Sequence, residues 1–206
     1  VQVHEGENTL VFTFVPKDIK KTFYMKITII GAGNMGGAIA RGLAQGSIIK
    51  ASDITCADPS KDNLAKIKAA NADFTLVQDN RAAVKNADIV IIAVKPWLVD
   101  SIINEIKFQL DYDKQIIVSI AAGVTFEQLN TYLLKADELE DIQIPAIFRL
   151  IPNIAIDVQS SMTFVASKNA TEEQEKLIVS LFNELGSAML IEEQQMSAGT
   201  ALASCG

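Results

Sequence analysis

The sequence predicts an α/β protein with a doubly wound, mostly parallel sheet flanked by helices. Short runs rich in Ile and Val alternate with segments of helical period from residue 25 onward, which is the pattern of βαβ units. The first run leads into residues 26–46, which contain six glycines. The strongest run, residues 89–94, is apolar at every position, as expected for a strand that is buried on both faces of a sheet.

Eight runs have the length and composition of strands. They are residues 26–30, 53–57, 74–77, 88–94, 116–120, 146–150, 161–166 and 188–191. Between them, Thr125 with Gln128 and Thr171 with Gln174 have the spacing of capping boxes, which predicts a helix after each threonine. Pro96 suits a first helical position. An apolar stripe with a period of four residues follows it, at Leu98, Ile102, Ile106 and Leu110.

Composition narrows the classes of function. The chain has 206 residues, of which 49% are hydrophobic and 21% charged, with a net charge of -7 and a pI near 4.8. We therefore expect no nucleic-acid binding, because such domains carry basic surfaces. We expect no membrane insertion, because a spanning helix needs about 20 apolar residues. Cys56 and Cys205 form neither a disulfide framework nor a metal-ligand pattern, which favours a cytoplasmic protein without a metal.

Two segments differ from the rest of the chain. Residues 1–24 precede Met25 and contain the one histidine, His4. They lack the order of a signal peptide, so we interpret them as an N-terminal extension, in which "TLVFTFV" has the composition of a strand. Residues 135–143 carry four acidic side chains without a period and are expected to form a solvated loop.

The glycines form a motif that suits a dinucleotide. Gly31, Gly33 and Gly36 give G-x-G-x-x-G between a predicted strand and a predicted helix, the context that supports a Rossmann-type domain. In this motif the first glycine permits a tight turn, the second lets a pyrophosphate approach, and the third lets the helix lie close to the sheet. Phosphates would then face the N-terminus of the helix that begins near Asn34 and Met35. A plain strand-to-helix turn is the simpler alternative.

The end of the second strand leaves the choice of cofactor open. Asp58 follows Gly36 by 22 residues, where an acid accepts hydrogen bonds from the adenosine ribose and favours NAD. Ser60 and Lys61 follow and could hold the 2′-phosphate of NADP instead. A third interpretation is that "DPS" only caps the next helix.

Two further strands end in residues suited to a ligand. Open α/β sheets bind ligands at the carboxyl ends of their strands. One strand ends there in Ala93, Val94, Lys95 and Pro96. The next ends in "SIAAGV", whose small side chains would let a flat ring approach the backbone.

Together these segments resemble pyrroline-5-carboxylate reductases. "IIGAGNMGGAIARGL", "DN" at 79–80, "ADIVIIAVKP", "SIAAGV" and "RLIPN" follow one another in the order and spacing of that family. The resemblance extends from Met25 to Gly206, and "GTALASCG" resembles the start of the family's second domain. The first and third motifs also suit β-hydroxyacid dehydrogenases and coenzyme-F420-dependent NADP reductases. "AVKP" together with "SIAAGV" is more particular to the reductases.

The resemblance implies site residues. With the motifs above, the candidate cofactor residues are Gly31, Gly33, Asn34, Met35, Gly36, Asp58, Ser60, Lys61, Asn80, Ala93, Val94, Lys95, Pro96, Ala121 and Ala122. The substrate side falls on Asn153, Glu193, Ser204 and Cys205. The catalytic residue is left open: Lys95 is one candidate for an acid, and a tyrosine in a segment missing from this sequence is another. The family's P-N-T-P reads "PNIA" here and its S-G-S-G reads "ASCG", so the departures lie on the substrate side.

The resemblance also implies a domain plan and a reaction. We expect an NAD(P)-binding domain at residues 25–192, and the start of a truncated helical domain for dimerisation and substrate binding at 193–206. The family transfers a hydride from NADPH or NADH to the C=N bond of 1-pyrroline-5-carboxylate, giving L-proline, and its full-length members form homo-oligomers. The alternatives are a non-catalytic NAD(P)-binding fragment and an oxidoreductase of the β-hydroxyacid dehydrogenase type.

Overall fold

The computed structural model describes residues 25–135 and 143–204. The extension 1–24 with His4, most of the predicted loop 135–143, and Cys205 lie outside the described residues. All eight predicted strands are present, with ends within three residues of the prediction. The strands are β1 Ile27–Ile30, β2 Ile54–Ala57, β3 Thr75–Val77, β4 Ile89–Ile92, β5 Ile116–Ser119, β6 Ala146–Ile151, β7 Ser161–Lys168 and β8 Gly186–Leu190.

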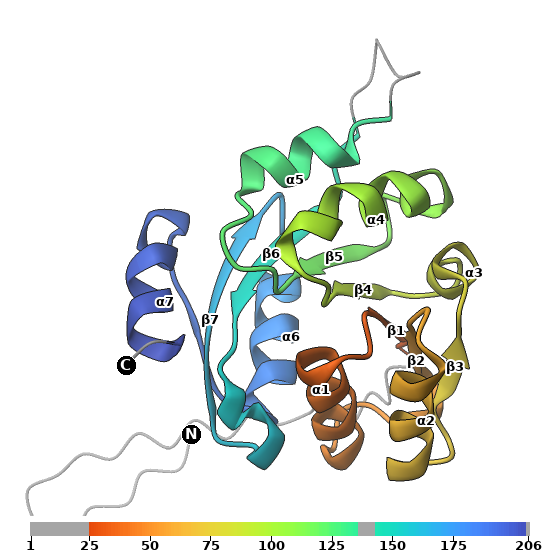
Figure 1. Cartoon of the computed structure of the whole chain (residues 1–206). Coiled ribbons are helices and arrows are strands. Elements are labelled where there is room, and N and C mark those ends of the chain that lie inside the picture. Colours follow the sequence, from red (N-terminus) through yellow and green to blue (C-terminus); the bar gives the residue numbers. More distant parts are fainter. Residues whose placement is uncertain (1–24, 136–142, 205–206) are drawn as a thin grey trace, which may run out of the picture.

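Helices connect these strands and cover the sheet (Figure 1). They are α1 Asn34–Gln45, α2 Lys61–Ala70, α3 Asn80–Val84, α4 Val99–Ile106, α5 Phe126–Leu133, α6 Glu172–Asn183 and α7 Met196–Ser204. Both predicted capping boxes are confirmed, with Thr125 and Thr171 as the N-cap residues of α5 and α6. No helix among the described residues is long and apolar enough to cross a membrane.

The strands form one sheet in the order β3-β2-β1-β4-β5-β6-β7-β8. Strands β1 to β6 pair in parallel, and β7 is antiparallel to β6 and parallel to β8. The predicted doubly wound, mostly parallel sheet is confirmed. The strand order reverses between β1 and β4, and ligands bind at such a switch point in open α/β sheets.

Two hydrophobic clusters, one on each face, hold the layers together. Ile29 and Ile91 pack with α1, α2 and α6, whereas Ile30 and Ile92 pack with α3, α4 and α5. Neighbouring residues of a strand face opposite sides, so a central strand covered on both faces can be apolar at every position, as β4 is. Cys56 of β2 belongs to the first cluster and is fully buried, and burial raises the pKa of its thiol to about 12. Cys56 is therefore a buried core residue with a protonated thiol.

The predicted stripe after Pro96 is partly wrong. Pro96 begins a short 3-10 helix, Pro96–Leu98, and α4 starts only at Val99. A 3-10 helix has three residues per turn, so the buried face shifts along the sequence. Val99 and Ile103 are fully buried, whereas Leu98 is 43% exposed.

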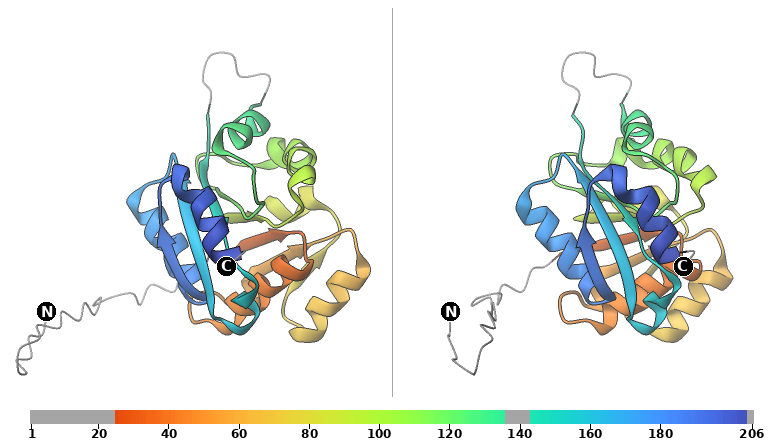
Figure 2. Two further views of the ribbon diagram at one scale, coloured as in Figure 1. Left: turned by 60° about the vertical axis from the view of Figure 1, so that its left-hand side comes forward. Right: turned by 90° about the vertical axis from the view of Figure 1, so that its left-hand side faces the viewer.

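Helix α7 packs on the sheet formed by β6 and β7 and lies beside them in both views of Figure 2. Met196 at its start is buried in the second cluster. A Cβ on Gly199 would lie 2.8 Å from Cδ2 of Phe164 on β7, so this glycine lets the helix approach the sheet closely. Met196 and Gly199, which lie beyond the expected domain boundary at 192/193, thus pack against the sheet.

The crossover from β1 to α1 predicts unequal effects for two glycines. A Cβ on Gly36 would lie 1.9 Å from the backbone oxygen of Gly31, whereas a Cβ on Gly33 meets nothing within 4 Å. We expect Gly36→Ala to lower the free energy of unfolding by about 1–3 kcal/mol because the backbone must move. Gly33→Ala, the matched control, should cost less than about 1 kcal/mol. Urea denaturation measures both, and equal losses would contradict the proposed close contact.

Candidate functional site

A cavity of about 750 Å³ lies at the carboxyl ends of β1 and β4. The loops after β1, β2, β4 and β5 contribute to its wall, as expected at a switch point. The predicted cofactor residues that line it are Gly31, Gly33, Asn34, Met35, Asp58, Asn80, Ala93, Val94, Lys95, Pro96, Ala121 and Ala122. Segments far apart in the sequence therefore converge on one cavity. Gly36, Ser60 and Lys61 do not line it.

The three glycines of the motif have three different geometric roles. Gly31 has a φ of +97°, which L side chains rarely adopt, and a Cβ on it would lie 2.6 Å from the backbone oxygen of Ala93. Gly33 borders open space, so the backbone there is accessible from the cavity. Gly36 lies against Gly31 and brings α1 onto the sheet. These contacts match the tight turn, the open approach and the close packing expected from the motif.

The N-terminus of α1 is open to an anion. Gly33 is its N-cap residue and has no side chain, and the first turn contains no acidic residue. The amide hydrogens of a first helical turn have no partner within the helix. Together with the positive end of the helix dipole, they favour a phosphate at this position.

Asp58 has a structural role at this wall. It is 6% exposed, and its Oδ2 accepts hydrogen bonds from the backbone N of Ala32 at 2.7 Å and from Nδ2 of Asn63 at 3.2 Å. Its Oδ1 accepts from the backbone N of Ser60 at 2.8 Å. The carboxylate thus connects the glycine loop to the start of α2, which supports the interpretation of "DPS" as a capping segment.

Ser60 and Lys61 lie outside the cavity. Ser60 is the N-cap residue of α2, and its hydroxyl accepts from the backbone N of Asn63 at 3.3 Å. Lys61 is exposed. The structure therefore does not bring these two candidates for a 2′-phosphate site into the wall that Asp58 and Asn80 form.

The opposite wall is built from small residues and one cation. Ala93, Ala121 and Ala122 line it, and their side chains leave room for a flat ring against the backbone. Lys95 is exposed, and no hydrogen bond or ion pair joins its side chain to another described residue. The described residues contain no group of three or more His, Cys, Asp or Glu side chains that could hold a metal ion.

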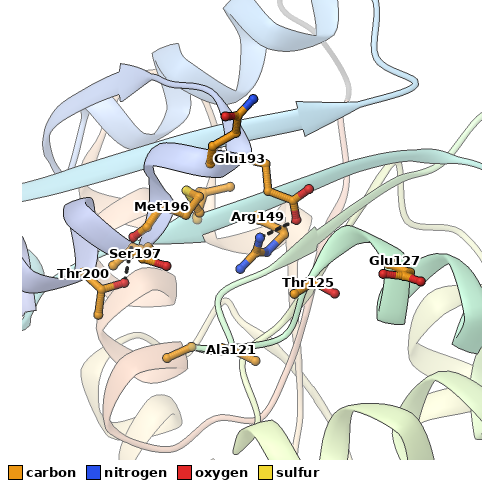
Figure 3. A pocket seen from close by; sticks show the side chains of 13 residues that line it. Ala121, Thr125, Glu127, Arg149, Glu193, Met196, Ser197 and Thr200 are labelled. Atoms are coloured by element: carbon orange, nitrogen blue, oxygen red, sulfur yellow. Dashed lines mark hydrogen bonds and ion pairs between the residues drawn. The ribbon is translucent and has the colours of Figure 1, made fainter.

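A second cavity of about 560 Å³ adjoins the first. Ala121, Ala122, Ile151 and Thr200 line both. Figure 3 shows Arg149 from β6 and Glu193 meeting at its wall, with Arg149 Nη1 2.6 Å from Glu193 Oε1. The same oxygen accepts from the backbone N of Phe126 at 2.9 Å.

Arg149 is a residue of this cavity that the sequence motifs did not indicate as a site residue. Its side chain is only 10% exposed, and a buried arginine requires a paired charge. The available signal was a single cation within the apolar strand "AIFRLI". Glu193 was predicted on the substrate side, and the structure places it in this second cavity, where its charge balances that of Arg149.

Asn153, also predicted on the substrate side, has a structural contact instead. Asn153 lines neither of these two cavities. Its Oδ1 accepts from the backbone N of Ala155 at 3.2 Å and caps the short helix Ile154–Val158. Ser204 is the last residue of α7, and Cys205 is outside the described residues. The structure therefore does not bring Asn153 and Glu193 into the same cavity.

Comparison with known proteins agrees with this geometry. Residues 26–123 match a family described as "NADP oxidoreductase coenzyme F420-dependent". Pyrroline-5-carboxylate reductase of Methanosarcina acetivorans is 32% identical over 182 residues, which cover 88% of this chain and 64% of that protein. This chain therefore spans less than two thirds of the length of that relative.

Two solved structures extend the similarity. The pyrroline-5-carboxylate reductase of Coxiella burnetii has a TM-score of 0.79 and 29% identity, over 89% of this chain and 65% of the other. The pyrroline carboxylate reductase of Plasmodium falciparum, solved with NADP bound, has a TM-score of 0.74 and 26% identity, over 87% and 62%. The chain is therefore similar to pyrroline-5-carboxylate reductases along most of its own length.

Proposed function

We propose that the chain binds NADH or NADPH in the first cavity and that its reaction is the reduction of 1-pyrroline-5-carboxylate to L-proline. The observation that carries the proposal is the shared wall at Ala121 and Ala122, where the first cavity meets the polar cavity of Arg149 and Glu193. A ring against this wall would face a substrate in the second cavity. The similarity to named pyrroline-5-carboxylate reductases supports the choice of substrate.

A nicotinamide dinucleotide fits the first cavity on two observations. Gly33 leaves open space at the N-terminus of α1, where a pyrophosphate would rest. Asn80 has a buried side-chain oxygen without a partner among the described residues, which a ligand could satisfy. When bound, the reduced cofactor supplies a hydride. The residues that would hold the cofactor are the predicted cofactor residues that line the first cavity.

The protein's own groups suit an imine. A cyclic imine is basic enough to arrive protonated, so that the protein need mainly position it. Reduction of a ketone would instead require a proton donor for the developing alkoxide. The described residues contain no histidine, and Lys95 is a candidate acid on the cavity wall.

Glu193 is placed to orient a protonated imine. Its Oε1 is occupied by Arg149 and Phe126, whereas Oε2 accepts no hydrogen bond from a described residue. We propose that Oε2 accepts a hydrogen bond from the N–H of the substrate and that Thr200 and Ser197 of α7 contribute hydroxyl groups to the same cavity.

Three further expectations remain predictions from the resemblance. They are a cytoplasmic location, a homo-oligomer and a separate function for residues 193–206.

The first test is turnover. The chain is incubated with NADH or NADPH and 1-pyrroline-5-carboxylate, and nucleotide oxidation is followed by absorbance, with proline measured as product. We expect oxidation that depends on the imine. A parallel assay supplies NAD or NADP with small hydroxyacids. Turnover of a hydroxyacid alone would favour a dehydrogenase. Cofactor binding without turnover of either substrate would contradict the reductase proposal for this chain and indicate a binding fragment.

A second test concerns the phosphate site. Gly33→Glu places a carboxylate in the space that the pyrophosphate would occupy, and an acid at a helix N-terminus does not destabilise the helix. We expect a folded protein whose affinity for NADH and NADPH falls at least about a hundredfold through like-charge repulsion and steric exclusion. Gly33→Ala is the matched control and should keep most of the affinity. Unchanged binding by the glutamate variant would exclude this loop as the phosphate site.

A third test separates the two interpretations of Asp58. If its carboxylate anchors the glycine loop, Asp58→Ser should weaken NADH and NADPH together and lower the free energy of unfolding by about 1–3 kcal/mol, because three donors lose their acceptor. Titration calorimetry and urea denaturation measure these effects. Asp62→Ser, at an exposed position on α2, is the control. A selective gain for NADPH would show instead that Asp58 contacts the ribose directly.

A further inference from the structure

Asn80 presents an unusual buried group on the first cavity. The residue is 8% exposed and begins α3, and it lines the cavity beside Asp58 and Pro59. Its Nδ2 donates to Oε2 of Glu105 on α4 at 3.0 Å. Its Oδ1 is buried and has no hydrogen-bond partner among the described residues.

Glu105 determines which way the amide of Asn80 points. An ionised carboxylate accepts hydrogen bonds and donates none, whereas the two ends of an asparagine amide are a donor and an acceptor. Rotation of the amide by half a turn would bring two acceptor oxygens to hydrogen-bond distance, which is unfavourable. The carboxylate therefore holds the nitrogen toward α4 and leaves Oδ1 as the free atom.

This oxygen is the acceptor that the wall leaves available. The neighbouring carboxylate of Asp58 already accepts three hydrogen bonds from the protein. A buried acceptor without a partner is unfavourable, so an occupant that donates a hydrogen bond to Asn80 gains affinity. A ribose hydroxyl is such a donor. A 2′-phosphate at neutral pH presents acceptor oxygens and negative charge instead.

The charged residues around Asn80 also favour a hydroxyl group over a phosphate. Of the residues that line the cavity, Asp58 and Lys95 are charged; Asp58 follows β2 in the wall of Asn80, whereas Lys95 follows β4 in the opposite wall. The cations Lys61 and Arg81 are exposed and do not line the cavity. Arg81 directs its Nε to the backbone oxygen of Glu105 at 3.2 Å. The wall thus offers an acceptor to a hydroxyl and no cation to a phosphate.

We propose that Glu105 is a positioning residue that orients Asn80 so that its Oδ1 accepts a hydrogen bond from the adenosine 2′-hydroxyl, and that the chain consequently prefers NADH to NADPH. The inference rests on the proposed binding of a dinucleotide and adds to it a residue outside the cavity. It assigns the choice between the two cofactors to the Asn80–Glu105 pair and leaves Asp58 its structural role.

The test measures binding, without turnover. The chain has one tryptophan, Trp97, which is 76% exposed between the cavity residues Pro96 and Leu98. Quenching of its emission by NADH or NADPH gives the two dissociation constants, and competition with ADP and 2′-deoxy-ADP isolates the hydroxyl. For the unmodified chain we expect NADH to bind about tenfold more tightly than NADPH, and ADP about tenfold more tightly than 2′-deoxy-ADP, as one hydrogen bond typically gives.

Variants separate orientation from general stability. Asn80→Ala should bring the ratio of ADP to 2′-deoxy-ADP affinities close to one. Glu105→Ala should do the same although Glu105 touches no ligand, because the amide of Asn80 is then free to rotate. Glu105→Gln should restore part of the ratio, since its amide oxygen can still accept from Asn80. Asn104→Ala is the matched control, because Asn104 is exposed on α4 and bonds only to Asp100.

The outcomes distinguish this inference from the proposed function. Equal binding of ADP and 2′-deoxy-ADP by the unmodified chain, or an unchanged ratio in a folded Glu105→Ala variant, would overturn the inference while leaving dinucleotide binding intact. Failure of NADH, NADPH and ADP to bind at all would overturn both. Circular dichroism of each variant confirms that the ratio is measured on folded protein.

Discussion

The ligand-binding edge of this protein depends on the close contact between α1 and the first crossover of the sheet. Gly36 has no side chain, so the helix can lie against the backbone of Gly31 and the methyl group of Ala93. The loop is also held from both sides, because Gly31 N donates to Ala57 O on β2 and Ala93 N donates to Ile30 O on β1, each at 2.8 Å. These contacts place the unpaired amides of α1 at the point where the strand order reverses. A bulkier helix start would move them away from the cavity.

Asp58 and Asn80 are two buried polar residues of one wall, and their hydrogen bonds give them different roles. The carboxylate of Asp58 accepts three hydrogen bonds and thereby connects the glycine loop to α2. The amide of Asn80 is bonded at one end only. A fully bonded group stabilises the folded state, whereas a partly bonded one favours an occupant that completes its hydrogen bonds. We therefore expect rigidity from Asp58 and selectivity from Asn80.

The sequence predicted the strands, the capping boxes and the cofactor loop because each depends on residues close together in the chain. Thr125 and Thr171 needed only a glutamine three positions later. The pairing of Arg149 with Glu193 was not predictable in this way, because 44 positions separate them. The role of Asp58 was also left open, since the acid suits either a ribose or a helix start, and only the position of Ala32 N identifies its partner. Local sequence patterns therefore predict helices, strands and turns. The pairing of charged and polar groups in a site depends instead on contacts between distant parts of the chain.

The same distinction explains why the substrate side differs from the motif-based prediction. Asn153 follows β6 in a segment where "PNIA" replaces P-N-T-P, and its side chain caps the next short helix. Ile154, in the place of the threonine, is 89% exposed and lines a third cavity with Arg41 and Asp157, which shares Gly33, Asn34 and Met35 with the first cavity. These residues therefore contribute no group to the cavity that shares Ala121 with the cofactor wall. Under the proposed function, recognition of the substrate by the described residues would depend on the pair of Arg149 and Glu193, whose charges balance each other, together with the hydroxyl groups of Ser197 and Thr200.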